Sequence, residues 1–278
     1  MATITVLGLG IIGSIWARHY QQDGHELKSW NRSSKPDAPG FEADLAESVR
    51  SSHFIHLCVA DPAAVQSLLH VVLPHAPRNA LIIQSSTISP AASLSFAEQS
   101  RTAGHRYVEA PFTGSKPAAE ARQLVFFMGG NLEDTTEALS LLQSLSRKQF
   151  FIGKPHQASA IKLAMNLQIA AVAQALTEGW HLAKQFGLDH DLFYSVLREN
   201  VAHSGLAELK EPKLKSGDYS PQFSVQHMRK DLGLALESSS GLQLRLTERA
   251  KEIYDLGMQA GLGSEDFISL EKLASENL

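Results

Sequence analysis

A long, nearly uncharged run of Ala, Leu, Ile and Val between Pro155 and Gly187 constrains the fold more than any other feature. Proline suits the first turn of a helix because its missing N–H would have no partner there, and glycine suits the position after the last turn. The run therefore predicts a helix over 157–186, much longer than the average of about 11–12 residues. A helix that is apolar on most faces must be buried on most faces, so we expect it to be the spine between two domains.

Lys162 is the first charged side chain of this run, and Asn166 shares its helical face because the two are four residues apart. A buried lysine is costly unless it is paired or used in chemistry. The alternative is a lysine whose stem lies along apolar surface while its ammonium reaches water. The run alone leaves both readings open. We expect no membrane span, because the helix carries several polar side chains: Lys162, Glu178, His181 and Lys184.

Composition excludes several classes of protein. The chain has 278 residues, of which 44% are hydrophobic and 19% charged, so it can bury a full core in one large domain or two ordinary ones. The net charge of −4 argues against a nucleic-acid or membrane-surface partner. The single cysteine, Cys58, rules out an intramolecular disulfide and fits a cytoplasmic protein. The 12 histidines show no pairing with carboxylates at metal-ligand spacing, so we expect no metal.

The N-terminal half begins with the pattern of a dinucleotide-binding βαβ unit. Residues 3–7 read as a strand, 14–22 as a helix and 26–31 as a second strand. A G-x-G-x-x-G segment lies between the first strand and the helix, with the residues Gly8, Leu9, Gly10, Ile11, Ile12 and Gly13. In this setting the first glycine permits a tight turn, the second lets a pyrophosphate approach the backbone, and the third lets the helix pack on the strand. The phosphates would meet free N–H groups at the helix N-terminus.

The end of the second strand indicates which nicotinamide cofactor binds. An NAD site places Asp or Glu here, where it accepts a hydrogen bond from the ribose 2′-hydroxyl. This chain instead has Asn31, Arg32, Ser33, Ser34 and Lys35. Arg32 offers a planar fork that matches a 2′-phosphate, and Ser33 and Lys35 add donors. Such residues are often only a solvated turn, but their position favours NADP(H) over NAD(H).

Small polar residues follow two later strands, at the carboxyl edge where open α/β sheets bind ligands. The strand over 80–84 leads to Thr87, which we expect to face the cofactor, and to Ser89, which suits a helix cap. The strand over 107–111 leads to Thr113, Gly114 and Ser115, whose hydroxyl and N–H groups could hold a carboxylate in a turn. A plain loop is the alternative for these three residues. Strands over 54–59, 124–130 and 149–153 complete a nucleotide-binding domain over 1–155.

The rest of the chain predicts helices only, in a domain over 156–278 that begins with the long helix. We expect the later helices at 189–197, 205–214, 223–240, 247–260 and from 264 onward. The predicted fold class is therefore α/β, with an N-terminal Rossmann-type doubly wound sheet joined by the long helix to an all-α C-terminal domain.

Four segments, in this order, resemble the signatures of the β-hydroxyacid dehydrogenase family, which includes 3-hydroxyisobutyrate dehydrogenases and glyoxylate/succinic semialdehyde reductases. They are the glycine segment at 8–13, A-P-F-T-G-S at 110–115, Lys162 with Asn166, and M-R-K-D-L at 228–232. N-R-S at 31–33 and G-S-K-P-A at 114–118 are similar to the NADPH-dependent glyoxylate/succinic semialdehyde reductase branch. Two departures predict a differently shaped pocket: His156 and Ala158 replace glycines of the family motif, and Phe112 and Thr113 replace its Val and Ser.

The resemblance implies an NADPH-dependent oxidoreductase that interconverts a small aldehyde or keto acid, similar to glyoxylate or succinic semialdehyde, and its hydroxy acid. It implies that Lys162 is the general acid and base and that Asn166 orients it or the substrate. The implied substrate contacts are Thr113, Gly114, Ser115 and Phe223. The implied cofactor contacts are Gly8, Leu9, Gly10, Ile11, Ile12, Gly13, Asn31, Arg32, Ser33, Lys35, Val59, Ala60, Thr87 and Lys230. The expected partners are a small carboxylic acid and further copies of the chain, in a homodimer or homotetramer.

Two alternatives stay open beside this reading. One is an imine reductase-like enzyme of the same fold, and the other is a non-catalytic, NADP-binding scaffold protein. Relatives of both kinds typically lack the catalytic lysine, so Lys162 disfavours both.

Overall fold

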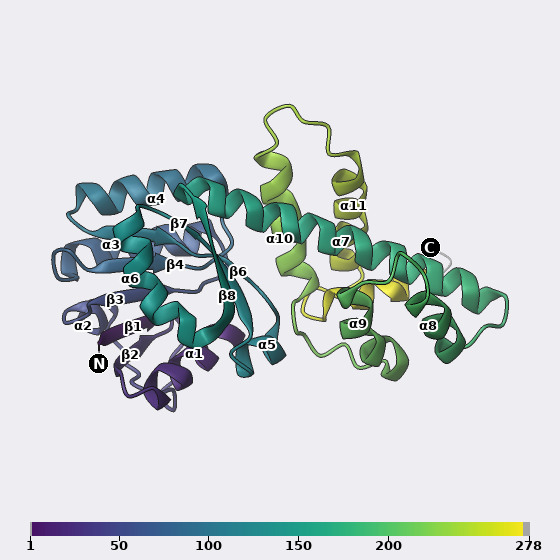
Figure 1. Cartoon of the computed structure of the whole chain (residues 1–278), viewed down its shortest axis with the longest axis horizontal. Helices are drawn as coiled ribbons and strands as arrows, with labels where there is room; N and C mark the ends of the chain where they lie inside the picture. Colours follow the sequence, from purple (N-terminus) through teal and green to yellow (C-terminus); the bar gives the residue numbers. More distant parts are fainter. Residues whose placement is uncertain (1, 275–278) are drawn as a thin grey trace. The chain divides into compact units, whose positions relative to one another are not determined.

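A computed structural model describes residues 2–274. The chain divides into two compact units, with the boundary between Leu163 and Ala164. Helix α7 (Pro155–Gln185) contributes to both units, and Figure 1 shows it running on from the last strand. It matches the predicted helix over 157–186 within two residues, and no strand lies between Pro155 and Gly187 in this fully described stretch.

The first unit is built on one sheet of eight strands. Five parallel strands lie in the order β2-β1-β3-β4-β5. Their bounds are β1 Thr3–Leu7, β2 Glu26–Trp30, β3 Phe54–Leu57, β4 Leu81–Gln84 and β5 Arg106–Glu109. Strand β7 (Leu124–Gly129) runs antiparallel to β5 and to the short β6 (Phe112–Thr113), and β8 (Ser146–Gly153) runs parallel to β7. This reversal at β7 was not predicted.

Helices cover both faces of the sheet because each strand presents apolar side chains to alternate faces. One apolar layer contains residues of α1 (Ile11–Gln22), α5 (Lys116–Glu120) and α6 (Leu132–Leu142). The other contains residues of α2 (Leu45–Val49), α3 (Pro62–His75) and α4 (Pro90–Thr102). The predicted doubly wound arrangement is therefore confirmed. Helix α1 begins at Ile11, three residues before the predicted start, because Gly10 already takes the N-cap position.

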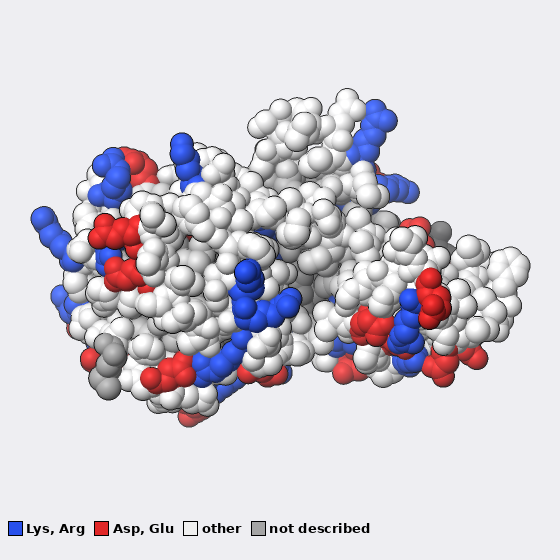
Figure 2. Space-filling view, in the orientation of Figure 1, with Lys and Arg blue, Asp and Glu red and all other residues white. Residues whose placement is uncertain are grey.

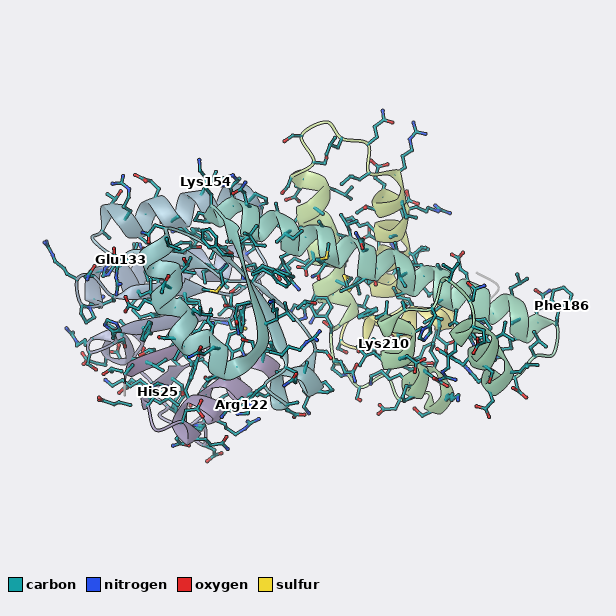
Figure 3. The ribbon with its side chains drawn as sticks, viewed as in Figure 1. His25, Arg122, Glu133, Lys154, Phe186 and Lys210 are labelled. Atoms are coloured by element: carbon teal, nitrogen blue, oxygen red, sulfur yellow. The ribbon has the colours of Figure 1, made fainter. Side chains whose placement is uncertain are left out.

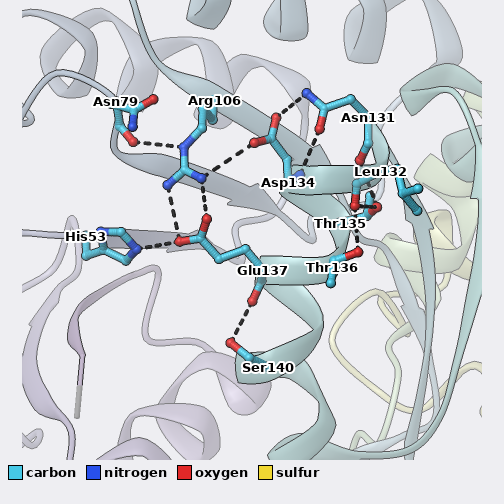
Figure 4. A network of polar contacts seen from close by, with 10 residues as sticks. All are labelled: His53, Asn79, Arg106, Asn131, Leu132, Asp134, Thr135, Thr136, Glu137 and Ser140. Carbon is cyan, nitrogen blue, oxygen red and sulfur yellow. Dashed lines mark hydrogen bonds and ion pairs between the residues drawn. The ribbon is translucent and has the colours of Figure 1, made fainter.

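A polar network ties α6 to the amino ends of β3 and β5 (Figure 4). The Arg106 guanidinium donates two hydrogen bonds to the Glu137 carboxylate, and its Nη1 lies 3.6 Å from Asp134 Oδ1. His53 Nε2 lies 2.5 Å from Glu137 Oε1. The hydrogen bond from Arg106 is the main reason that the pKa of Glu137 is lowered. This network fixes the sheet edge opposite the carboxyl ends of the strands.

The second unit contains the rest of α7 and further helices around a core that includes Tyr194, Met228 and Tyr254. The helices are α8 His190–Arg198, α9 Gly205–Ser216, α10 Val225–Glu237, α11 Arg245–Gln259 and the 3₁₀ segment Phe267–Ala274. Among the described residues this unit has no strand, only an isolated bridge between Ser224 and Asp266. The predicted helices are confirmed within a few residues, except that the tail is 3₁₀ rather than α-helical and its last four residues lie outside the described range.

The expectation that α7 is buried on most faces is wrong for a single copy of the chain. Only 33% of its most apolar window is buried. Figure 2 shows few charged side chains over α7, and in Figure 3 Phe186, just past its end, points outward. By length and composition alone this helix could cross a membrane, a test that core helices of other proteins also pass.

Candidate active site

The three motif glycines sit in different surroundings. Gly8 has φ +102°, and a Cβ built there would lie 2.3 Å from the Cys58 carbonyl oxygen. A Cβ on Gly13 would lie 1.9 Å from the Gly8 carbonyl oxygen. A Cβ on Gly10 would meet no described atom within 4 Å. Gly8 and Gly13 are therefore required by packing, whereas Gly10 leaves its side of the loop open, as a pyrophosphate needs.

The N-terminus of α1 has no side-chain cap among the described residues. Seven other helices do have one, from Asp44, Asp61, Ser89, Asn131, Asp189, Ser204 and Ser224. The first N–H groups of a helix lack intrahelical partners, and anions bind well there. The open side of Gly10 and this uncapped end together fit a dinucleotide phosphate.

Some of the residues after β2 contact the glycine segment, and others face outward. Asn31 Oδ1 accepts a hydrogen bond from the Leu9 N–H at 2.9 Å, and Lys35 Nζ donates to the Leu9 carbonyl at 2.5 Å. Leu9 itself is buried, so its side chain belongs to the core. Arg32 and Ser33 are exposed, and Arg32 forms no ion pair or hydrogen bond within residues 2–274. The guanidinium of Arg32 therefore has no partner in the described part of the chain.

The carboxyl ends of β3 and β4 are joined by hydrogen bonds. The Ser86 hydroxyl accepts from the N–H of Val59 at 2.9 Å, and the Gln84 side chain bonds both backbone groups of Ser86. Ala60 is exposed and Thr87 is half-buried at the same edge. The structure therefore brings together the predicted cofactor residues that follow these two strands.

The predicted substrate residues Thr113, Gly114 and Ser115 link β6 to α5. Thr113 lies in strand β6 rather than in a turn, which corrects that part of the prediction, because it pairs with Val125 of β7. Gly114 has φ +116°, which favours glycine, and a Cβ there would lie 2.8 Å from Leu124 Cδ2. The hydroxyls of Thr113 and Ser115 form no hydrogen bond with any described residue, and Ser115 does not cap α5. Both hydroxyls are available to a ligand.

Lys162 lies beside this segment inside the first unit. The residue is only 9% exposed, and its Nζ is 5.8 Å from the centroid of the Phe112 ring. The residue is therefore mostly buried, which favours a lysine that is paired or used in chemistry. A cation is stabilised over an aromatic face, so Phe112 contributes to holding the ammonium in place.

In the second unit, Asp231 links two other predicted site residues. Asn166 Nδ2 donates to Asp231 Oδ2 at 2.5 Å, and Lys230 Nζ lies 2.8 Å from Asp231 Oδ1. Asp231 is buried, and our reasoning from sequence gave it no role although it lies next to Lys230. The ring of Phe223, a predicted substrate contact, packs against Phe267 and His227.

A second residue missed from sequence is Glu109, the last residue of β5. It is fully buried and accepts hydrogen bonds from Tyr107 Oη at 2.6 Å, Ser93 Oγ at 2.8 Å and Gln84 Nε2 at 2.8 Å. Burial raises the pKa of this carboxyl to about 7, against the lowering effect of its donors. The only sequence signal was its position directly before the A-P-F-T-G-S segment.

The departure at Ala158 has a local explanation. Ala158 is fully buried at the start of α7, and a Cβ built on Gly129 would lie 3.0 Å from the Ala158 Cβ. Ala158 is therefore accommodated because position 129 has no side chain. His156 is half-buried, and its Nδ1 has no partner in the described part of the chain. Within residues 2–274, no three His, Cys, Asp or Glu side chains are grouped as metal ligands.

Comparison with known proteins decides the family. Residues 3–153 match the family model described as the NAD binding domain of 6-phosphogluconate dehydrogenase. Residues 157–274 match the model described as NAD-binding of NADP-dependent 3-hydroxyisobutyrate dehydrogenase. The chain belongs to the β-hydroxyacid dehydrogenase family. It is accordingly an NAD(P)-dependent oxidoreductase of the hydroxyacid dehydrogenase type.

Individual relatives support this membership over nearly the whole chain. The chain is 28% identical to glyoxylate/succinic semialdehyde reductase 1 of Arabidopsis thaliana, and the match covers 94% of each protein. It is 27% identical to the mitochondrial 3-hydroxyisobutyrate dehydrogenase of Drosophila melanogaster, covering 95% of this chain and 86% of that one. A solved 3-hydroxyisobutyrate dehydrogenase of Mycobacterium tuberculosis with L-serine has the same fold, with a TM-score of 0.89 and 23% identity. The match covers 99% of this chain and 100% of that one.

Proposed function

We propose that this family member reduces a small aldehyde or keto acid, similar to glyoxylate or succinic semialdehyde, with NADPH. The names of the relatives from Arabidopsis support this substrate class. The exposed, uncommitted guanidinium of Arg32 supports the preference for NADPH, because a bidentate fork matches the 2′-phosphate. The bound nicotinamide would supply the hydride.

The observation that carries the proposal is Lys162, buried with its Nζ over the Phe112 ring. The proposed role of Lys162 is to donate a proton to the carbonyl oxygen during reduction, and to accept it back in the reverse direction. An ammonium in a water-poor site also stabilises the negative charge that develops on that oxygen. The hydroxyls of Thr113 and Ser115, with the N–H groups near Gly114, would hold the substrate carboxylate.

Asn166 and Lys230 are proposed to act together with Asp231. The hydrogen bond from Asn166 and the ion pair with Lys230 fix this carboxylate from two sides. Asn166 follows Lys162 by one helical turn of α7, so a fixed Asn166 can orient a ligand near the lysine. Phe223 is proposed as an apolar contact for the substrate.

The deciding experiment follows NADPH oxidation by absorbance with a panel of small aldehyde and keto acids. We expect turnover with at least one acid, and more slowly with NADH. Turnover of cyclic imines but of no carbonyl acid would instead indicate the imine reductase-like alternative. Tight NADPH binding without any turnover would indicate a non-catalytic scaffold and would end the proposal.

We also propose that the chain assembles as a homodimer or homotetramer. The exposed apolar side chains Val172 and Val196 line an apolar groove of about 320 Å³ between α7 and α8, and Leu182 and Leu192 are also exposed on these helices. Contiguous apolar surface of this kind is typical of protein interfaces. Light scattering coupled to size-exclusion chromatography should give a multiple of the 30.3 kDa chain mass, and Val196→Glu should reduce it. A monomer at micromolar concentration would refute this.

A further inference from the structure

A second network of buried hydrogen bonds runs through the first unit, on the face of the sheet that α1 covers. Tyr20 Oη lies 3.0 Å from His56 Nδ1, and His56 Nε2 lies 2.8 Å from Ser85 Oγ. Ser85 Oγ then donates to the carbonyl oxygen of Ala110 at 2.7 Å. Tyr20, His56 and Ser85 are all almost completely buried. This network of hydrogen bonds thus connects α1, β3 and β4 to the residue that opens the substrate segment.

The direction of each hydrogen bond in this network is fixed. The single proton of Ser85 goes to Ala110, so Ser85 must accept from His56 Nε2–H, and His56 Nδ1 must accept from Tyr20. Burial lowers the pKa of His56 to about 3 and raises that of Tyr20 well above its ordinary value. The imidazole therefore stays neutral and the phenol stays protonated at any working pH, and this arrangement does not change with pH.

Ala110 is held on both sides of its backbone. Its N–H donates to the Gln84 carbonyl at 2.7 Å, and its own carbonyl accepts from Ser85. If the β4–β5 ladder continued, the Ser86 N–H would be the partner of this carbonyl, but it donates to Gln84 Oε1 instead. The Ser85 hydroxyl thus replaces a missing strand partner just where the chain leaves β5 for Phe112 and Thr113.

An aromatic stack connects the same histidine to Lys162. The Trp16 ring stacks on His56 with centroids 4.3 Å apart, and meets the Phe112 ring edge-on at 5.1 Å. Phe112 is the ring over which the Lys162 ammonium lies. Trp16 and Tyr20 are one turn apart on α1, the helix that begins at the glycine segment.

We propose that His56 is a positioning residue of this site: through Ser85 it sets the Ala110 carbonyl, and through Trp16 it sets Phe112. The helix that would receive the cofactor phosphates and the segment that would hold the substrate carboxylate are then held as one body. Near-attack geometry is sensitive to displacements of about 1 Å, so loosening this connection should reduce catalysis although these side chains are buried. The kinetic part of this inference rests on the function proposed above.

The test compares Ser85→Ala and Tyr20→Phe with Ser100→Ala as a matched control. Ser100 is also fully buried on the first unit and donates one hydrogen bond, to the Phe96 carbonyl within α4. We expect Ser85→Ala to lower kcat/KM by roughly tenfold, mainly through KM for the acid, with NADPH affinity unchanged. Tyr20→Phe should have a smaller effect of the same kind. Ser100→Ala should leave both kinetic constants unchanged.

Amide hydrogen exchange gives a readout that does not need turnover. Exchange over 112–115 should become faster in Ser85→Ala and Tyr20→Phe but not in Ser100→Ala. If Ser85→Ala matches the control in both exchange and kinetics, the hydrogen-bond network only contributes to core packing and the inference is wrong. If the parent protein turns over no acid, the proposed function fails, while the exchange comparison still decides whether His56 and Ser85 position this segment.

Discussion

Replacing Glu109 by Gln should change how the stability of the protein depends on pH. Glu109 is fully buried, and it accepts hydrogen bonds from Tyr107, Ser93 and Gln84. Glutamine has nearly the same shape but cannot ionise. The hydroxyls of Tyr107 and Ser93 can rotate to accept from the new amide, so the packing of the site should survive the substitution.

The magnitude follows from the pKa of the carboxyl. Burial raises the pKa of Glu109 from 4.5 to about 7, so the folded chain binds more protons than the unfolded chain between these values. The free energy of unfolding must therefore fall as pH rises through this window. At about 1.4 kcal/mol per pKa unit, the total loss is about 3 kcal/mol. The Glu109→Gln variant lacks this loss, so its stability relative to the parent should rise by about 3 kcal/mol from acid to neutral pH.

The assay is urea unfolding of both proteins at a series of pH values, with the carbon-13 NMR shift of the Glu109 carboxyl as a direct readout of its pKa. Glu137→Gln is the matched control, because the pKa of Glu137 is lowered, chiefly by its hydrogen bond from Arg106. Its carboxylate contributes stability above the unfolded pKa, which is lost as pH falls through the folded value. The two variants should therefore deviate from the parent in opposite directions at neutral pH. The reasoning would be refuted if the free energies of unfolding of Glu109→Gln and the parent changed with pH in parallel. It would also be refuted if the Glu109 carboxyl titrated near 4.5.

Four further predictions concern the site itself. Arg32→Ala should weaken NADPH binding far more than NADH binding, and an equal loss in fluorescence titrations would remove its proposed role. Gly10→Ala should leave the melting temperature unchanged but weaken NADP(H), whereas Gly13→Ala should destabilise the fold by about 1–3 kcal/mol or more through overpacking. Lys162→Ala should lower the turnover number by roughly 10²–10⁴-fold with NADPH affinity retained, and turnover within a few-fold of the parent would exclude it as the proton donor. The methyl ester of a good acid substrate should react much more slowly than the acid. Comparable kcat/KM values would argue against binding of the substrate carboxylate by residues 113–115.

Local patterns in the sequence were sufficient for most of the secondary structure. The helix over 157–186 and the strand–glycine–helix unit at the N-terminus depend on neighbouring residues only, and both are confirmed. Ser89 caps α4 as expected, because a cap needs only its own helix. The glycine segment could be placed in the same way, since its position between strand and helix is visible in the sequence.

Features that depend on how the strands lie side by side could not be predicted. The antiparallel direction of β7 is set by its pairing with β5 and β6, which no local pattern specifies. Glu109 and His56 belong to apolar runs, and their partners come from neighbouring strands and helices. Only the lateral order β3-β4-β5 brings these groups together, so their networks appear only in three dimensions.

Polar contacts on both faces of the sheet explain how the end of β5, where the substrate segment begins, is held in place. On one face Glu109 is held by Tyr107, Ser93 and Gln84, and on the other Ala110 is held by Ser85 and, through it, by His56. Successive residues of one strand point to opposite faces, so the two networks hold the adjacent residues 109 and 110 from opposite sides of the sheet. The backbone at 109–110 is thus held by side chains of neighbouring elements. The segment that follows adds constraints of its own, at Phe112, which packs against Trp16, and at Gly114, whose φ of +116° favours glycine.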